Sequence, residues 1–200
     1  MLTRRLSPFT LVLLSGIVFT GCAKKEPESQ SAQTGGPSSA MSAGSTTASS
    51  ASAAGIHWTV PARWSALPPK PMRVATYIIP GPNGSADSAE CAVYFFGTGQ
   101  GGGVDDNVAR WSGQFEGSPK AATTAETING LSVTTVHIAG TYLSPGGPMM
   151  QSQGAVKDYR LLGAIVQAPE GNVFFKTTGP AAVIAGTESE FQALLHSFTK

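Results

Sequence analysis

Apolar and polar residues alternate over much of the chain from residue 72 onward, and clusters of glycine, proline and asparagine interrupt the alternation. Stretches rich in β-branched and aromatic residues predict strands, and the turn residues between them predict hairpins. The expected strands cover residues 72–80, 89–97, 122–128, 131–143, 159–168 and 172–178. Because hairpin turns join most of these strands, we expect a largely antiparallel sheet.

Two segments have the spacing of a helix instead. Apolar residues between 104 and 115 recur at intervals of four, three and four, which places them on one helical face. Those between 191 and 198 recur at three, one and three, and Thr187 followed by Glu190 has the pattern of a capping box. The order strand, strand, helix, four strands, helix predicts an α+β domain: a mostly antiparallel sheet of about six strands with two main helices.

The first 22 residues have a different character. Arg4 and Arg5 precede an apolar stretch, and small residues then lead to a cysteine in Phe19-Thr20-Gly21-Cys22. This is the order of a bacterial secretory signal, and the segment is short for a membrane-spanning helix. With a cysteine at the junction, it resembles the lipobox of bacterial lipoproteins, which implies that Cys22 is lipidated.

We therefore expect residues 1–21 to be a lipoprotein signal peptide and Cys22 to be the lipid-anchored N-terminus of a cell-envelope protein, facing the periplasm or the exterior. An ordinary cleaved signal, or a single-pass anchor with an incidental cysteine, is the alternative. Arg4 and Arg5 also suggest twin-arginine export. The Leu6-Ser7-Pro8 segment that follows fits that pattern poorly, so general secretion is favoured.

Residues 22–55 are mostly serine, alanine, threonine, glycine and glutamine, and they contain no aromatic residue. Such a composition cannot offset the entropy of ordering the chain, so a disordered tether is expected. Its typical end-to-end distance is roughly 30 Å by the random-coil rule. Order is expected from residue 56, and residues 56–200 have the usual size of one domain.

Charge and cysteine content narrow the range of possible functions. Of 13 basic residues, 11 remain once Arg4 and Arg5 are removed, against 12 acidic residues. The mature chain therefore lacks the positive charge that nucleic-acid binding requires, and no nucleic-acid partner is expected. Cys91 lies in a strand-like apolar segment, where an inert buried thiol is favoured over a reactive or intermolecularly paired one.

A short phrase near the start of the expected domain carries a family resemblance. Trp58-Thr59-Val60-Pro61-Ala62-Arg63-Trp64 precedes the strand and helix order given above. Together they resemble the PsbP/Mog1-type α+β fold, whose domains open with such a phrase and continue into an antiparallel sheet. Residues 91–115 and 161–179 also resemble uncharacterised bacterial envelope proteins. The resemblance implies a fold, and it implies no activity because a fold does not fix function.

A glycine-rich loop is the first candidate contact site. Gly97, Gly99 and Gly102 satisfy the GxGxxG phosphate fingerprint after an expected strand and before an expected helix, and Gln100 lies between them. Asp105 and Asp106 occupy the helix start, however, where they would repel a phosphate. The hairpin-rich pattern also lacks the βαβ units of a nucleotide fold. A flexible or close-packed turn is therefore favoured over phosphate binding. A calcium loop is disfavoured as well, because the carboxylates lack alternating spacing.

A second candidate loop carries Met149 and Met150. Adjacent thioethers can hold Cu(I), but methionines more often fill gaps or line contact surfaces. His57, His137 and His196 lie far apart in the sequence without metal-ligand spacing, so no metal site is predicted.

No arrangement of serine, cysteine, histidine or paired carboxylates points to catalysis, and no cofactor motif is found. We therefore expect a membrane-anchored, non-enzymatic module for protein interaction or assembly, with an envelope protein as partner. The candidate contact surface comprises the loop at Gly97–Gly103, with Asp105 and Asp106, and the loop at 145–150. The alternative is a small-ligand or metal-ion-binding domain that uses either loop. A hydrolase would need a triad assembled in space.

Overall fold

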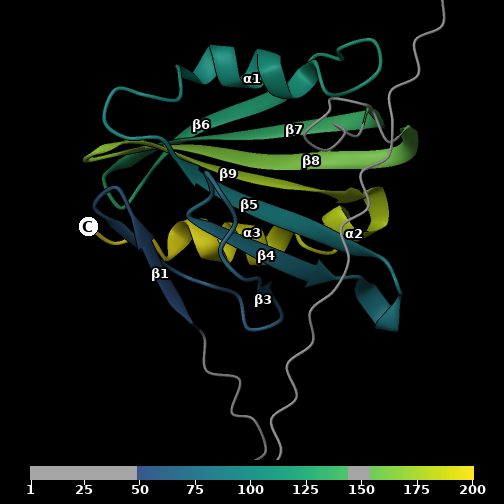
Figure 1. Cartoon of the computed structure of the whole chain (residues 1–200), viewed down its shortest axis with the longest axis horizontal. Coiled ribbons are helices and arrows are strands. Elements are labelled where there is room, and N and C mark those ends of the chain that lie inside the picture. Colours follow the sequence, from purple (N-terminus) through teal and green to yellow (C-terminus); the bar gives the residue numbers. More distant parts are fainter. Residues whose placement is uncertain (1–48, 144–153) are drawn as a thin grey trace, which may run out of the picture. The chain divides into compact units, whose positions relative to one another are not determined.

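The strands of this chain form one large antiparallel sheet and one small hairpin. The computed structural model describes residues 49–143 and 154–200, which belong to a single unit within Gly44–Lys200 (Figure 1). The large sheet has seven strands in the order β3-β4-β5-β9-β8-β7-β6. Its strands are β3 (Ser65–Ala66), β4 (Ala75–Pro80), β5 (Ser88–Phe95), β6 (Ala122–Ile128), β7 (Leu131–Leu143), β8 (Ala155–Ala168) and β9 (Gly171–Pro180).

The remaining elements of the described residues are the small hairpin and three α-helices. The hairpin pairs β1 (Ser50–Ala53) with β2 (Ile56–Thr59). The helices are α1 (Val104–Ser112), α2 (Ala181–Ala185) and α3 (Glu188–His196), and a 3-10 turn, η1, covers Pro82–Gly84. No helix in the described part of the chain is long and apolar enough to cross a membrane.

The α+β fold class expected from the sequence is confirmed. Every pairing in the large sheet is antiparallel, and the expected partnership of β4 with β5 is present. Asn129 and Gly130, both with positive φ (49° and 78°), form the turn between β6 and β7 that their sequence indicates. The sheet has seven strands rather than about six, because the two-residue β3 gives too short a signal to recognise.

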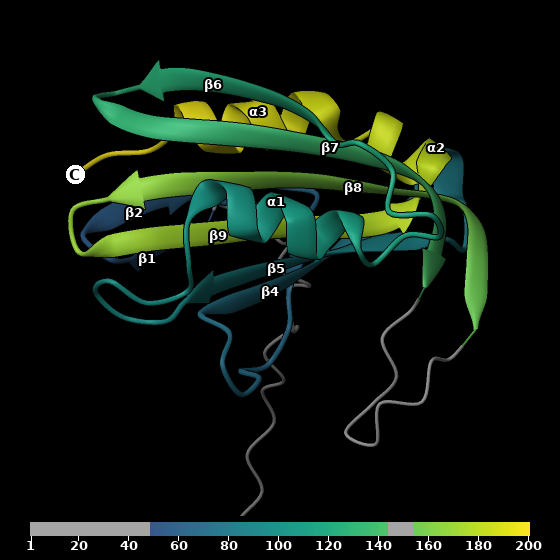
Figure 2. The same ribbon diagram turned by 90° about the horizontal axis from the view of Figure 1, so that it is seen from above.

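Helices cover the two faces of the large sheet unequally. On one face, α2, α3 and the β1–β2 hairpin enclose the main core, which includes Trp58, Phe175 and Leu195. On the other face, α1 contributes Trp111 to a smaller core with residues of β7, β8 and β9. Figure 2 shows α1 and α3 on opposite sides of the sheet. We call these the closed face and the open face.

The folded part begins earlier than the sequence indicates. Residues 50–53 were expected in the tether, but they form β1 and pair with β2, from Ser50 opposite Thr59 to Ala53 opposite Ile56. The expected boundary at residue 56 is therefore wrong. Backbone hydrogen bonds and the packing of small alanines against the core order this strand, and neither depends on large apolar side chains. The signal peptide, Cys22 and the tether up to residue 48 lie outside the described residues.

Residues 58–64, which carry the family resemblance, contact both the sheet and α3. Trp58 lies edge-on to Phe175 at 5.1 Å, and its Nε1 donates to the Tyr77 hydroxyl at 3.2 Å. Trp64 Nε1 donates to Glu190 Oε2 at 2.9 Å, and the Arg63 guanidinium donates to both oxygens of the same carboxylate at 2.9 and 2.7 Å. These bonds hold the start of the domain against its C-terminal helix.

The same carboxylate explains why the expected capping box is wrong. Thr187 makes no side-chain capping bond at the start of α3, and its hydroxyl donates instead to the Val183 carbonyl at 2.8 Å. Glu190 is engaged by Arg63 and Trp64, so it is not available to the backbone of Thr187. A bidentate arginine pair is stronger than a neutral capping bond.

Candidate binding site on the open face

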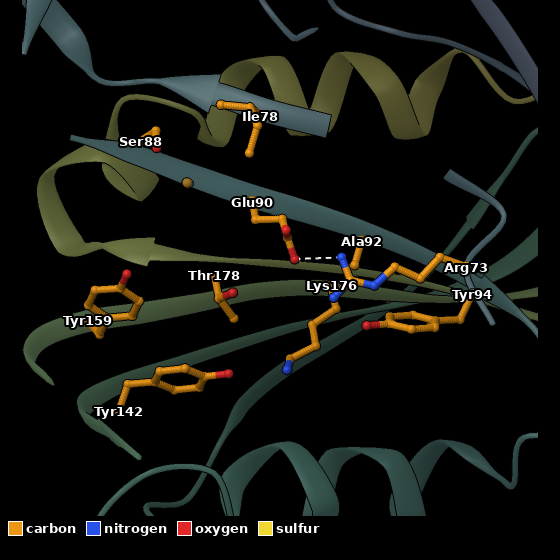
Figure 3. Close-up of a pocket in the computed structure, with 11 residues that line it drawn as sticks. Arg73, Ile78, Ser88, Glu90, Ala92, Tyr94, Tyr142, Tyr159, Lys176 and Thr178 are labelled. Carbon is orange, nitrogen blue, oxygen red and sulfur yellow. Dashed lines mark hydrogen bonds and ion pairs between the residues drawn. The ribbon is translucent and has the colours of Figure 1, made fainter. Parts of the chain in front are cut away.

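A cavity of about 370 Å³ lies on the part of the open face that α1 leaves uncovered (Figure 3). Its lining comes from strands far apart in the sequence. The charged and aromatic lining residues are Arg73, Glu90, Tyr94, Tyr142, Tyr159 and Lys176. Among the lining groups are also the side chains of Ser88 and Thr178, so the cavity is largely polar.

Strand alternation places the charged residues together. Glu90 lies opposite Thr178, and Ala92 lies opposite Lys176, in the pairing of β5 with β9. Because successive side chains of a strand point to opposite faces, the neighbouring Cys91 and Thr177 point into the closed face. The pattern of β5 and β9 therefore delivers a carboxylate and an ammonium group to the same cavity.

A glycine in β8 determines where α1 packs. A Cβ atom added to Gly163 would lie 2.4 Å from Cζ3 of Trp111, far inside van der Waals contact. The absence of a side chain at this position lets the indole lie directly on the sheet. Helix α1 is thereby held over β8 and its neighbours, while the region over β4 and β5 stays uncovered.

Glu90 is the centre of an ion cluster at the cavity. Arg73 Nη1 lies 2.7 Å from Glu90 Oε1, and Lys70 Nζ lies 3.1 Å from Glu90 Oε2. Burial alone would raise the pKa of Glu90, but hydrogen bonds from Arg73 and Lys70 outweigh it and hold the pKa below its usual value. The Arg73 guanidinium also lies over the Tyr94 ring at 5.6 Å from the ring centre.

Lys176 has no such carboxylate partner. Its Nζ donates to Gln114 Oε1 at 2.5 Å and lies 5.8 Å from the centre of the Tyr142 ring. None of the ion pairs in residues 49–143 and 154–200 includes it. Burial lowers the pKa of Lys176 to about 8, and repulsion from Arg73 and Arg110 adds to this, against a smaller opposing effect of Glu90.

Tyrosines form the walls of the cavity. Tyr142 and Tyr159 stack with their ring centres 5.4 Å apart and their planes 13° from parallel. Burial raises the pKa of Tyr142 to about 12 and also raises the pKa of Tyr94. Both phenols are therefore neutral at physiological pH. The Tyr142 hydroxyl donates to Gln114 Oε1 at 3.4 Å, and the Tyr94 hydroxyl can donate a hydrogen bond to a bound group.

A second cavity, of about 190 Å³, adjoins the first. Tyr94 and Lys176 line both, so the two cavities meet at these residues. The second is bounded by side chains of α1 and by two phenylalanines: Phe96, Asn107, Arg110, Trp111, Gln114 and Phe174. We call the joined cavities the open-face groove.

The glycine loop predicted as a contact site lies beside this groove without lining it. Gly97, Gly99 and Gly102 have positive φ (101°, 72° and 80°), which the backbone turn requires. Several loop carbonyls are already bonded: Asn107 Nδ2 donates to the carbonyls of Gly101 at 2.9 Å and Gly103 at 2.8 Å, and Asn172 Nδ2 donates to that of Gly102 at 3.2 Å. The glycines are therefore explained by the conformation of the loop, and its binding role stays a prediction.

The other predicted loop residues are placed as follows. Gln100 and Asp105 are exposed, and Asp106 Oδ2 accepts from the Gly103 backbone N–H at 3.4 Å at the start of α1. Met149 and Met150 lie outside the described residues. A contact surface that combines the two predicted loops therefore stays a prediction.

Metal-ligating side chains are dispersed in the described residues. No group of three or more histidine, cysteine, aspartate or glutamate residues there could hold a metal ion. Cys91 is free and fully buried, and burial raises the pKa of its thiol to about 12. The expectation that Cys91 is a buried core residue is confirmed. The raised pKa disfavours the thiolate, which is the reactive form.

Arg73, Glu90 and Lys176 were not identified from the sequence. A signal for two of them exists: Glu90 lies between Ala89 and Cys91, and Lys176 directly follows Phe174 and Phe175, so each is a single charge inside a strand. Such a charge interrupts the pattern of a buried strand and indicates a polar site at one face. Arg73 gives no comparable signal, because it precedes β4 in a proline-rich turn.

Comparisons with known proteins add structural neighbours. No protein-family model matches the chain, and no curated protein matches it. Among solved structures, the chain is similar to cyanobacterial PsbP (CyanoP) from Synechocystis sp. PCC 6803, with a TM-score of 0.49 and 12% identity, covering 81% of this chain and 97% of that chain.

A crystal structure from Bacteroides thetaiotaomicron VPI-5482 is also similar, with a TM-score of 0.35 and 10% identity, covering 72% of this chain and 44% of that chain. The first of these neighbours is a PsbP protein. Both TM-scores lie below 0.5, so the α+β fold class rests on the strand order and registers of this chain itself.

Proposed function

We propose that this protein is a lipid-anchored, non-enzymatic module of the cell envelope that binds another protein in the open-face groove. The observation that carries the proposal is the composition of the groove. Three tyrosines and an arginine line its larger cavity, and these residue types supply most of the binding energy at protein interfaces. The groove also runs through two adjoining cavities, and such a groove suits an extended segment better than a compact molecule.

Exposed apolar residues beside the groove also support a protein partner. Phe96 lines the smaller cavity and is 39% exposed, and Met72, directly before Arg73, is 75% exposed. Met72 also has a positive φ of 62°, a conformation that costs free energy for a residue with a side chain. Apolar surface next to polar anchors is the usual anatomy of an interaction site.

A small-ligand-binding domain is the second candidate function. A cavity of about 370 Å³ falls within the size range of small-molecule sites. A small number of charged groups converge on it, as is usual at such sites. This candidate now concerns the groove rather than the glycine loop, where side chains outside the loop already bond the carbonyls of Gly101, Gly102 and Gly103. The tests below separate the two candidates.

Site-specific photocrosslinking in intact cells of the native host tests the partner. A photoreactive phenylalanine analogue replaces Phe96 in the groove or, as the control, Thr124 on the exposed edge strand β6. We expect a discrete protein adduct from position 96 that added wild-type chain reduces, and none from position 124. Equal adducts from both positions, or no adduct from position 96, would contradict the proposal.

The lipid anchor is tested separately. The substitution Cys22→Ala removes the thiol that acylation requires, so lipid labelling should disappear and the protein should leave the membrane fraction. Membrane fractionation and metabolic labelling with a fatty-acid analogue measure both effects. A variant that remains in the membrane to the same extent as the wild type would refute the lipobox.

A further inference from the structure

We propose that Lys176, supported by Arg73, binds a carboxylate of the partner protein where the two cavities of the open-face groove meet. This inference rests on the proposed function and names the group that the groove recognises. The relevant source is an acidic side chain within an extended segment of the partner. Charge, geometry and the energetic cost of the site each point to this chemistry.

The charge of the groove is unbalanced. Arg73, Lys70 and Lys176 bring three cations to the cavity and its ion cluster, whereas Glu90 brings one carboxylate. Glu90 is already bonded to the first two, so it does not neutralise Lys176. Arg110 adds a further cation on the side of the second cavity. The groove is therefore complementary to an anion.

The donors around Lys176 are arranged to converge on one group. An ammonium group has three N–H donors, and Gln114 accepts from one of them. Figure 3 shows the hydroxyls of Tyr94 and Tyr142 directed toward the Lys176 amine from two sides. The Tyr142 hydroxyl donates to Gln114 Oε1 at 3.4 Å, so Tyr94 is the phenol from which a carboxylate oxygen placed against the amine can also accept. Arg73, whose guanidinium lies over the Tyr94 ring, contributes a second cation.

Lys176 is costly for the fold. It lies in the middle of β9, next to Phe175, and burial disfavours its charged form. A neutral residue of similar length would fill the same space without this desolvation penalty. A carboxylate bound beside the amine would favour the charged form again, so the penalty of the free protein is offset in the complex.

A carboxylate fits the groove better than a phosphate. Glu90 lies beside Arg73 at 2.7 Å, and it would repel a doubly charged phosphate more strongly than a singly charged carboxylate. The groove also lacks a row of backbone N–H groups among its described lining residues, where phosphate sites commonly place them. Phosphate is therefore a competing outcome of the test.

The test uses the purified full-length chain and short blocked peptides. One peptide carries glutamates in an extended, tyrosine-containing sequence, and its counterpart has glutamine at every glutamate position. Sodium glutarate and inorganic phosphate serve as small-anion probes. Isothermal titration gives affinities, and the NMR resonances of ¹³C-labelled lysine report the state of the Lys176 amine.

We expect the glutamate peptide to bind, to raise the Lys176 pKa, and to bind at least tenfold more tightly than the glutamine peptide. Lys176→Met should remove at least ninety per cent of the affinity. Lys120→Met is the matched control, because it makes the same charge change at an exposed residue outside the groove, and its affinity should equal that of the wild type.

Three results would overturn the inference: equal binding of the two peptides, an unaltered affinity after Lys176→Met, or an unaltered Lys176 resonance at millimolar peptide. Glutarate binding as tightly as the peptide would overturn the assignment to a protein segment. Phosphate binding more tightly than glutarate would overturn the assignment of the bound group as a carboxylate. If the adduct at position 96 forms while peptide discrimination fails, only this inference falls. If the adduct is absent, the proposed function falls as well.

Discussion

The two faces of the large sheet are made by the same strands, and they differ in chemistry from one residue to the next. In β5 and β9, Cys91 and Thr177 point into the closed face and are fully buried. Their neighbours Glu90 and Lys176 point into the open face and line the groove. Helices and the β1–β2 hairpin seal the first face, whereas α1 covers only part of the second.

This difference separates residues that the fold needs from residues that it tolerates. The closed face follows the rule that apolar side chains pack together, and Phe175, Val93 and Phe191 have no exposed surface. The open face instead holds an ammonium group in β9 that burial disfavours. Proteins retain such unfavourable local choices mainly at functional sites. The comparison therefore assigns stability to the closed face and recognition to the open face.

The largest expected effect comes from truncating the closed face. Phe175→Ala removes a fully buried ring that packs edge-on against Trp58, so the free energy of unfolding should fall by about 3–5 kcal/mol. Tyr94→Ala, a matched truncation of an aromatic residue on the open face, should cost less than half of this. Guanidinium denaturation followed by circular dichroism measures both, and equal losses would contradict the division between the faces.

The next effect has the opposite sign. Lys176→Met should raise the free energy of unfolding by about 2 kcal/mol at pH 7, because the gain from removing a buried charge exceeds the loss of the bond to Gln114. A gain of stability on replacement of Lys176 would show that the fold does not need this residue. Destabilisation by this substitution would show that Lys176 is structural.

The pH dependence of stability tests the state of Lys176 by a second measurement. The pKa of Lys176 is about 8 in the folded chain and 10.5 for an unperturbed lysine, so the unfolded chain holds more protons between these values. The stability of the wild type should therefore gain a contribution as pH rises from about 8 to 10.5, and Lys176→Met should lack it. Denaturation series at several pH values measure the difference; parallel curves would contradict it.

A smaller effect is expected where α1 meets the sheet. Gly163→Ala places a methyl group against Trp111, so it should lower the free energy of unfolding by about 1–2 kcal/mol. In a Trp111→Leu background the same change should cost less than half as much, because the overlapping ring is gone. A double-mutant cycle measures this coupling. An equal cost in both backgrounds would show that Gly163 does not position α1.

The smallest effect concerns the contact of Arg63 with Glu190, which is partly exposed. Glu190→Gln should cost about 1 kcal/mol at pH 7. The hydrogen bond from Arg63 holds the pKa of Glu190 below 4.5, so this stabilisation is present above that value and is lost as pH falls through the lowered pKa. The difference between wild type and variant should disappear in acid, and thermal unfolding at pH 7 and pH 3 tests it.

The sequence was most informative where local pattern alone decides structure. The spacing of Val104, Val108 and Trp111 predicted α1, although the helix ends at Ser112, before Phe115. Asn129-Gly130 predicted the hairpin of β6 with β7. Elements without such a pattern were missed. Residues 50–53 read as tether because their ordering depends on pairing with β2, and α2 is only five residues long.

The candidate site could not be predicted because it depends on the arrangement of strands. Glu90 and Lys176 are 86 positions apart in the sequence, and only the pairing of β5 with β9 brings them to one cavity. The openness of that cavity depends in turn on where Gly163 lets Trp111 pack. The glycine loop was conspicuous in the sequence for a different reason, which is the positive φ that its turn requires.

The pKa of Lys176 in the full-length chain is the sharpest test of a recognition site on the open face. NMR titration of ¹³C-labelled lysine gives this value, and the resonance lost in Lys176→Met identifies the residue. We expect a pKa of about 8 in the free protein and a higher value with the glutamate peptide bound. A pKa near 10.5, unaltered by the peptide, would contradict it.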